Sequence, residues 1–164
     1  MIGQPLVYET LAALEIPFDY LEHPEAPTVE IAKQYWTALG GTHCKNLFFR
    51  NHKGDRHYLV VFDCDRDLAI HDLERRLRQG KLSFASAARL ERYLGVRPGS
   101  VSPFGLLNDA DRHVHLFLDR RLRAASRLSF HPNDNRASLS IPLAGLVRFL
   151  EHVGNGYEWI DLYE

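Results

Sequence analysis

Apolar residues recur at two spacings along the chain, and these spacings predict short helices that alternate with strands. Apolar positions three or four residues apart indicate amphipathic helices, whereas runs rich in aromatic and β-branched residues indicate strands. The predicted helices cover Val7 to about Leu14, Thr28 to about Leu39, Asp67 to Leu77, Ser86 to Leu94 and Pro142 to Val153. The predicted strands cover Phe18 to Leu21, Asn46 to Arg50, Tyr58 to Asp63, Val114 to Leu118, Arg127 to Phe130 and Ala137 to Ile141.

Residues with capping chemistry mark where the helices begin and end. The predicted N-caps, whose side-chain oxygens can accept hydrogen bonds from free backbone N–H groups, are Thr28, Asp67 and Ser86. Gly95 is predicted to end the helix that Ser86 begins, and Gly40-Gly41 the helix that Thr28 begins. In the latter helix the spacing places three residues on one face, namely Ile31, Tyr35 and Leu39.

The order of these elements predicts the fold class. The segment Leu59-Val60-Val61-Phe62 is apolar on both faces, which predicts a central strand covered on each side. The turn-forming residues 51–55 predict that this strand forms a hairpin with the preceding one. No repeat or long linker divides the chain. We therefore expect an α+β fold, a single domain spanning residues 1–164, with a mixed or antiparallel central sheet flanked by helices.

Composition excludes several classes of protein. The chain has 164 residues, of which 45% are hydrophobic and 25% are charged, as expected for a globular protein rather than a disordered or fibrous one. No apolar stretch approaches the roughly 18 residues of a membrane span, and the first residues lack a signal-peptide pattern. We therefore expect a cytoplasmic protein with no membrane partner. Cys44 and Cys64 form no CxxC motif and are expected to be free thiols.

Charge argues against nonspecific binding to nucleic acid. Twenty Lys and Arg residues oppose 21 Asp and Glu residues, which gives a net charge of −1. Two local basic clusters stand out, one of Arg75, Arg76, Arg78 and Lys81 and the other of Arg120, Arg121, Arg123 and Arg127. They could bind phosphates if the fold brings them together, or they could belong to solvated surfaces.

Lys45 is a candidate functional residue because it interrupts an apolar strand face. Strand alternation places it on the same side as Leu47 and Phe49. If it points into a pocket, its ammonium group supplies a fixed positive charge for a phosphate, a carboxylate or a transition-state oxygen. The alternative is a side chain that reaches from the strand end into water.

Two loops could also contribute to a site. The segment from Gly99 to Pro103 combines a glycine that can adopt positive φ with a rigid proline, so it could present backbone groups to a ligand or serve as a plain connector. His131 precedes Pro132, which favours an extended conformation that could direct the imidazole at a site or let it stabilise a turn.

No metal or nucleophile motif accompanies these residues. His113 and His115 share a strand face, but no third ligand is evident, and we expect neither a metal nor another cofactor. The chain has no GxSxG, Walker or Rossmann motif, and neither cysteine has an identifiable histidine partner. If the protein is an enzyme, we expect it to act mainly by positioning its substrate.

Several motifs, taken in order, resemble those of a known family. They are Lys45-Asn46-Leu47-Phe48, Tyr58 to Val61, Leu82 to Ser86, Pro98 to Leu106, Asn108-Asp109, Phe130 to Asn135 and Ala137 to Leu139. This order is similar to that of the YbaK/prolyl-tRNA synthetase-associated editing domains, and the later motifs resemble the freestanding ProX/PrdX-type branch. The resemblance covers nearly the whole chain, roughly Tyr8 to Val153.

The resemblance implies a trans-acting deacylase that removes a wrong amino acid, alanine for this branch, from tRNA-Pro. It implies attack on the ester by water, helped by a hydroxyl of the terminal ribose, with no metal and no covalent enzyme intermediate. The family positions imply catalytic roles for Lys45, Gly99 and Pro103, and substrate-binding roles for Asn46, Ser100, Val101, Ser102 and His131. The implied partners are the aminoacylated CCA end of tRNA-Pro and, less directly, prolyl-tRNA synthetase.

Two other interpretations stay open at the level of sequence. The same fold could act on cysteinyl-tRNA-Pro or another mischarged tRNA, which depends on the volume of the pocket. A module that binds tRNA or the synthetase without catalysis is the second alternative, although it would not need both Lys45 and the loop that contains Gly99 and Pro103. The oligomeric state is open as well.

Overall fold

The computed structural model describes residues 1–25 and 28–162. Its α-helices are α1 (Pro5–Ala13), α2 (Val29–Trp36), α3 (Ile70–Leu77), α4 (Ala87–Leu94) and α5 (Leu143–Val153), joined by the 3-10 helices η1 (Pro103–Asn108) and η2 (Arg120–Ala124). The strands are β1 (Asp19–Glu22), β2 (Thr42–Arg50), β3 (His57–Asp63), β4 (Ser83–Phe84), β5 (His115–Asp119), β6 (Arg127–Phe130), β7 (Ala137–Pro142) and β8 (Tyr157–Ile160). None of the helices in the described ranges is long and apolar enough to cross a membrane.

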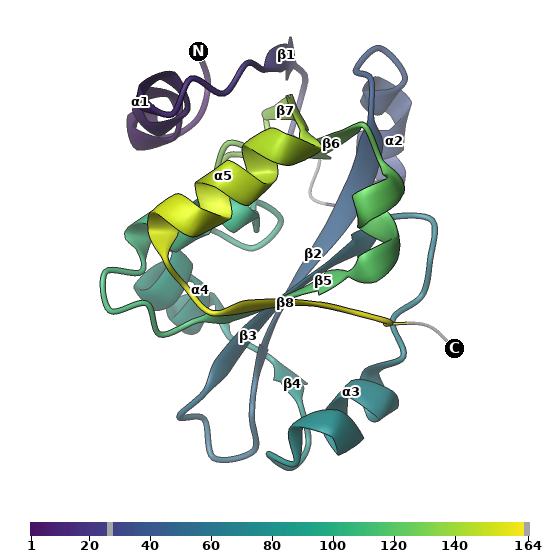
Figure 1. Ribbon diagram of the computed structural model, residues 1–164, viewed down its shortest axis with the longest axis vertical. Coiled ribbons are helices and arrows are strands. Elements are labelled where there is room, and N and C mark those ends of the chain that lie inside the picture. Colours follow the sequence, from purple (N-terminus) through teal and green to yellow (C-terminus); the bar gives the residue numbers. More distant parts are fainter. Residues whose placement is uncertain (26–27, 163–164) are drawn as a thin grey trace.

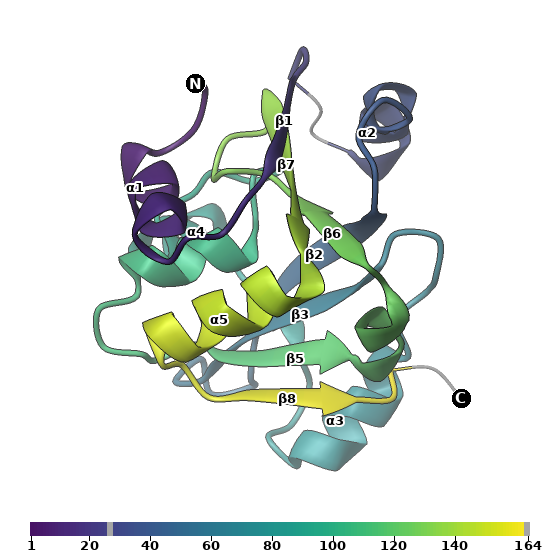
Figure 2. The same ribbon diagram turned by 45° about the horizontal axis from the view of Figure 1, so that its top comes forward.

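The strands form one mixed sheet in the order β1-β7-β6-β2-β3-β5-β8, with β4 attached to β2 (Figures 1 and 2). The β2–β3, β6–β7 and β1–β7 pairs are antiparallel, whereas β2–β6, β3–β5 and β5–β8 are parallel. The expected α+β class with a central sheet flanked by helices is confirmed, and of the two predicted sheet types it is the mixed one.

The sheet opens along one edge of β2. On one side, β3 pairs with β2 continuously from Cys44 to Arg50. On the other side, β6 pairs only with Thr42 and His43, and β4 only with Phe49 and Arg50. Because these two neighbours meet opposite ends of β2, the middle of that edge has no partner strand among the described residues.

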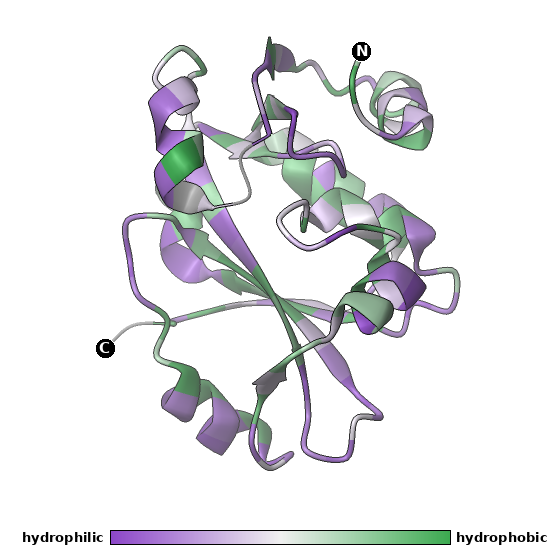
Figure 3. Cartoon of the chain, turned by 180° about the vertical axis from the view of Figure 1, so that it is seen from behind, coloured by the Kyte–Doolittle hydropathy of each residue, from purple (hydrophilic) through white to green (hydrophobic). Residues whose placement is uncertain are grey.

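Apolar residues cover both faces of the sheet, as the sequence of β3 predicts. Leu59 and Val61 face the larger core cluster, to which α1, α4 and α5 contribute. Val60 and Phe62 face a smaller cluster that includes residues of α3. The middle of the sheet is accordingly hydrophobic in the view from behind (Figure 3). All four residues are buried, so β3 is the expected central strand.

Most of the predicted caps are present, but the start of α3 was predicted wrongly. Thr28 and Ser86 accept hydrogen bonds from the N–H groups of Ile31 and Arg89, and Gly95 ends α4 in the left-handed conformation. Asp67, in contrast, does not cap α3, which begins at Ile70 without a side-chain cap. The carboxylate of Asp67 is therefore available for another role.

The C-terminal end of α2 also differs from the prediction. The helix ends at Trp36 rather than near Leu39, because a turn follows it before Gly41 adopts a positive φ of 102°. Ala32 and Trp36 are buried, whereas Ile31 is 36% exposed. The face of α2 that packs inward is thus one position away from the face that the apolar spacing indicated.

Candidate functional site

A cavity of about 510 Å³ lies beside the open edge of β2. This volume is typical of small-molecule sites, which span roughly 300–1,000 Å³. Its walls come from α2, β2, the segment before α3, β4, the loop before η1, and the β6–β7 region. The polar or exposed lining residues that matter most are Lys45, Asn46, Asp67, Phe84, Gly99, His131 and Ser138.

Lys45 extends from the strand face that alternation predicts. Its register partner on β3 is Phe62, and its ammonium Nζ lies 6.0 Å from the centroid of that ring. Leu47 and Phe49 belong to the same apolar cluster as Phe62, which confirms the expected face. No carboxylate among the described residues forms an ion pair with Lys45. The cavity therefore contains a positive charge for which the described part of the chain supplies no counterion.

Asn46 directs polar groups to the open edge of β2. Its side-chain Nδ2 donates to the carbonyl oxygen of Cys44 at 3.3 Å, while its Oδ1 is buried without a hydrogen-bond partner in the described part of the chain. The carbonyl of Phe48 points to the same edge, where it accepts from the N–H of Ala85 at 2.9 Å. Because backbone groups alternate along a strand, the N–H and C=O of Asn46 point to that edge too.

The loop that follows α4 brings only part of its predicted site residues to the cavity. Gly99 adopts a φ of 87°, as its glycine identity predicts, and Gly99 and Val101 line the cavity. Ser100 and Ser102 lie behind this wall, where their side chains accept hydrogen bonds from the backbone N–H groups of Asn135 and Phe104. Pro103 is buried and begins η1. The direct contacts of these three residues hold the loop in shape.

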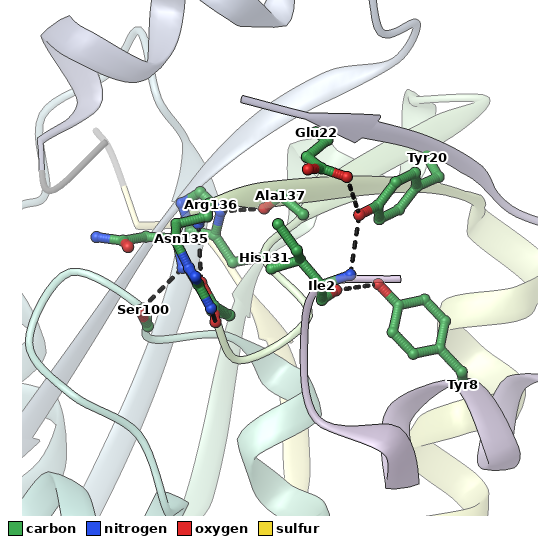
Figure 4. A network of polar contacts seen from close by, with 10 residues as sticks. Ile2, Tyr8, Tyr20, Glu22, Ser100, His131, Asn135, Arg136 and Ala137 are labelled. Carbon is green, nitrogen blue, oxygen red and sulfur yellow. Dashed lines mark hydrogen bonds and ion pairs between the residues drawn. The ribbon is translucent and has the colours of Figure 1, made fainter. Parts of the chain in front are cut away.

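His131 lines the cavity and also stabilises the turn between β6 and β7 through a hydrogen bond. Its Nδ1 lies 2.8 Å from the carbonyl oxygen of Ala137 (Figure 4). Because that oxygen only accepts, Nδ1 carries the proton of this bond and Nε2 of the neutral ring is an acceptor. Burial lowers the pKa of His131 below its ordinary value, which favours the neutral ring. The turn-stabilising and site-directed interpretations of this residue are therefore compatible.

Ser138 connects α2 to the cavity wall through a buried network that the sequence did not indicate. Its Oγ accepts from Trp36 Nε1 at 3.1 Å and lies 2.9 Å from His23 Nε2. His23 Nδ1 donates to the carbonyl of Pro24 at 2.8 Å, so Nε2 accepts the Ser138 proton. A Ser–His pair at this distance can form a nucleophile, but Ser138 is only 1% exposed and its oxygen is occupied by Trp36. These hydrogen bonds are typical of a structural residue that stabilises the packing of α2 against the sheet.

Two further lining residues were not identified from the sequence as site residues. Asp67, which was predicted as a helix cap, is exposed at the cavity, and among the described residues it has no hydrogen-bond or ion-pair partner. Phe84 also lines the cavity although its side chain is 66% exposed. Tertiary structure brings both into the lining of the cavity that Lys45 also lines, from segments about 20 and 40 positions later in the chain.

Neither the cysteines nor the basic clusters add chemistry to the cavity. Both thiols are free. Burial raises the pKa of Cys64 to about 11 and holds that of Cys44 well above its ordinary value, so both stay protonated at neutral pH. Four of the eight residues in these clusters form ion pairs with nearby carboxylates, namely Arg75 with Asp72, Arg76 with Glu158, Arg120 with Asp161 and Arg127 with Asp19. Within the described ranges, no arginine of either cluster lines the cavity.

One group of metal-ligating side chains lies nearby. The ligand atoms of Asp63, Cys64 and Asp65 are within 4.8 Å of one another. Asp65 is already bound by Lys33 Nζ at 2.6 Å, and the Cys64 thiol is protonated, which leaves a poor donor set for a metal ion.

Fold and cavity together define a small α+β domain with a cationic, partly apolar ligand site, and comparison with known proteins identifies its class. Residues 23–149 match the model of the aminoacyl-tRNA editing domain. The chain belongs to this family, and the expected class of enzyme, an aminoacyl-tRNA deacylase, is confirmed by that match. The family resemblance of the sequence motifs is thereby confirmed as well.

Named relatives span nearly the same length. The chain is 36% identical over 162 residues to the prolyl-tRNA editing protein ProX of Acetoanaerobium sticklandii, and the alignment covers 99% of both chains. It is 39% identical over 145 residues to the prolyl-tRNA synthetase associated domain-containing protein 1 of Danio rerio, covering 87% of this chain and 78% of that protein.

A solved structure supports the fold independently. A crystal structure provisionally described as a trans-editing enzyme for prolyl tRNA synthetase superimposes with a TM-score of 0.70 over 98% of both chains. Its sequence identity to this chain is 23%, so this similarity concerns the fold alone.

Proposed function

We propose that this protein is a trans-acting deacylase for mischarged tRNA-Pro, and that its preferred substrate is alanyl-tRNA-Pro. The observation that carries the proposal is the Lys45 ammonium group, which has no counterion among the described residues and lines the same cavity as Asn46, whose Oδ1 has no partner there. The similarity to the protein named ProX in Acetoanaerobium sticklandii supports tRNA-Pro as the acceptor. We assign this activity to one domain that spans residues 1–164.

The reaction is the hydrolysis of an ester. Water attacks the carbonyl carbon, the bond to the ribose oxygen breaks, and the products are a free amino acid and a tRNA with a free terminal hydroxyl group. Negative charge develops on the carbonyl oxygen during the attack, and a preorganised cation stabilises that charge. We assign this role to Lys45, either at the oxygen itself or through the adjacent phosphate, with no resident metal or cofactor.

The other predicted site residues would hold the substrate. Asn46 can accept a hydrogen bond at Oδ1 and donate one from its backbone N–H, and His131 can accept one at Nε2. Gly99 and Val101 present the loop surface, while Ser100, Ser102 and Pro103 keep that loop in shape. Fixing the ester between these groups lowers the entropic cost of attack.

The two unpaired charges of the cavity match the charges of an aminoacylated 3′ end. Such a substrate carries an α-ammonium group and, one ribose away, a phosphate. We assign the ammonium group to Asp67 and the phosphate or the developing oxyanion to Lys45. Each interaction would place a ligand charge beside a protein charge that otherwise only water solvates.

Alanine is the expected amino acid because a synthetase pocket built for proline cannot exclude a smaller side chain sterically. Each lost methylene costs only about 1–3 kcal/mol of discrimination. A second site that admits a methyl group and rejects the proline ring corrects the error. The cavity of about 510 Å³ must also hold the ribose, so the amino-acid subsite is a fraction of it.

A deacylation panel tests the proposal. Purified protein is mixed with alanyl-, cysteinyl- and prolyl-tRNA-Pro, with and without EDTA, and the remaining ester is measured over time. We expect rapid loss of alanyl-tRNA-Pro, intact prolyl-tRNA-Pro and no effect of EDTA. Faster loss of the cysteinyl ester would reassign the substrate. Binding of tRNA without hydrolysis of any ester would indicate a noncatalytic binding module.

A further inference from the structure

Phe84 is an aromatic side chain left open to solvent at the wall of the cavity. It lines the cavity and is 66% exposed, although the apolar residue two positions earlier, Leu82, is only 3% exposed. One region of its ring contacts Phe49, with ring centroids 4.8 Å apart and an interplanar angle of 26°. The remaining ring surface has no aromatic partner among the described residues.

The backbone around Phe84 is fixed, so the ring is held in place rather than attached to a mobile loop. Phe84 pairs with Phe49 in the β4–β2 ladder. The next residue, Ala85, donates its N–H to the carbonyl of Phe48 at 2.9 Å, and Ser86 caps α4. A ring on an anchored backbone, stacked on Phe49, presents a preorganised flat surface, which lowers the entropic cost of stacking a planar ligand.

Phe84 lies on the side of the sheet that also carries Lys45. Phe49, on which Phe84 stacks, is four residues beyond Lys45 on the same face of β2, a distance of roughly 13 Å along a strand. Leu47 lies between them on that face. Apolar side chains thus lead from the exposed ring, at the end of β2 that pairs with β4, toward the ammonium group of Lys45.

We propose that Phe84 stacks on a nucleobase of the single-stranded 3′ end of the tRNA while Lys45 binds the backbone or reacting group further along. This inference rests on the proposed function and adds a base-binding subsite to it. Proteins that bind single-stranded nucleic acid combine aromatic platforms with positive charges, and every base offers a π-face to such a ring. Phe84 and Lys45 supply such an aromatic platform and such a positive charge in one cavity.

The test measures RNA binding separately from hydrolysis. The probes are an uncharged acceptor-stem hairpin that ends in a single-stranded CCA segment and the same hairpin without those three nucleotides, each labelled for fluorescence anisotropy. Wild-type protein should prefer the CCA hairpin. F84A should lose affinity for it by about 5- to 150-fold, the effect of removing one base–aromatic stack, and should bind the shortened hairpin like the wild type.

Two control variants accompany F84A. F84W retains a stacking surface and should keep the preference for CCA, with quenching of its added fluorescence by the CCA hairpin. L6A removes another exposed apolar side chain, 43% exposed on α1 and outside the cavity lining, and should change nothing. Thermal melts of all variants test whether each one is folded.

The outcomes separate the stacking site from the proposed function. Unchanged CCA preference in F84A, or a wild-type protein that does not distinguish the two hairpins, would overturn the stacking role even if deacylation is normal. A wild type that deacylates no ester but loses CCA preference on F84A substitution would retain the stacking site and refute the deacylase. With an active enzyme, F84A should raise KM and leave kcat nearly unchanged, and a loss confined to kcat would contradict a binding platform.

Discussion

At the scale of single residues, we propose that the chemistry of the cavity centres on Lys45. K45A should lower the rate of deacylation on the order of 10²-fold or more, since it removes one preorganised positive charge from the transition state. The melting temperature should stay close to that of the wild type, because the ammonium group has no ion pair among the described residues to lose. Single-turnover kinetics and a thermal melt check both parts.

K45R is the companion to that variant. It keeps the charge but replaces a compact ammonium group with a bulkier, planar guanidinium. A site that only attracts phosphate should tolerate K45R well, whereas a site that positions the charge at one oxygen should not. We expect poor tolerance. Wild-type rates for K45A at saturating and subsaturating tRNA would refute the assignment.

Asp67 should matter only for substrates that carry a positive α-ammonium group. D67N should lower kcat/KM for alanyl-tRNA-Pro by roughly 5- to 10-fold, as expected for losing one partly solvated charge interaction. N-acetylalanyl-tRNA-Pro lacks that charge, so wild type and D67N should hydrolyse it equally. D111N is the matched control, since Asp111 is an exposed aspartate outside the cavity lining. An equal loss on both esters in D67N would exclude recognition of the ammonium group.

Sequence reasoning could find Lys45 but not Asp67 or Phe84, and the reason is physical. A lysine on an apolar strand face conflicts with the local pattern, so the alternation of residues along the strand is enough to identify Lys45 as a candidate. An aspartate before a helix and an aromatic residue in a short strand agree with ordinary local roles, and only tertiary contacts place them in the cavity. The assigned roles of all three residues stay predictions until the variants are measured.

At the scale of elements, the loop before η1 depends on the conformation of Gly99. G99A should impair deacylation by at least about 10-fold and destabilise the fold by on the order of 1 kcal/mol, because a φ of 87° strains any residue that has a Cβ atom. The loop would relax and displace the wall of the cavity. Deacylation rates and urea unfolding measure the two effects.

Gly40 offers a control for that substitution. It has no positive φ, and a Cβ atom added there would meet no atom within 4 Å. G40A should therefore leave both activity and stability nearly unchanged. If G99A behaves like G40A, the loop does not need its left-handed glycine for function.

Caps and apolar spacing predicted most elements because their signals are local. Thr28, Ser86 and Gly95 act within one turn of their own helices. The strands β4 and β8 were not predicted. β4 has only two residues, too few for a period to be recognised, and both strands pair with segments that are distant in the chain.

At the scale of the whole molecule, the cavity lies where the sheet is incomplete at β2. The parallel β2–β6 contact is limited to two residue pairs, and so is the antiparallel β2–β4 contact. Between these two contacts, β2 presents backbone groups and the side chains of both its faces to one cavity. Such an opening depends on long-range pairing, which explains why the sequence indicated Lys45 and Asn46 as candidates without indicating the gap beside them.

Stability of the whole fold should depend on pH through a buried histidine outside the cavity. His57 is 1% exposed, its Nε2 accepts from Arg89 at 2.9 Å, and its Nδ1 donates to His113 Nε2 at 2.8 Å. Burial, followed by the nearby charges of His113 and Arg89, lowers the pKa of His57 from 6.5 to about 4. The ring of Tyr93 also packs on both imidazoles, tilted against His57 and stacked on His113.

The sign of the effect follows from where the proton binds. Below pH 6.5 the unfolded chain takes up a proton that folded His57 resists until about pH 4, so protonation favours unfolding across that window. The free energy of unfolding should be fully retained above pH 6.5 and should fall toward pH 4, by at most about 3 kcal/mol from this residue. H57Q should flatten that part of the curve, whereas H52Q, at an exposed histidine, should not. Urea unfolding at half-unit pH steps measures the slope, and equal slopes for wild type and H57Q would show that His57 is not the group that titrates.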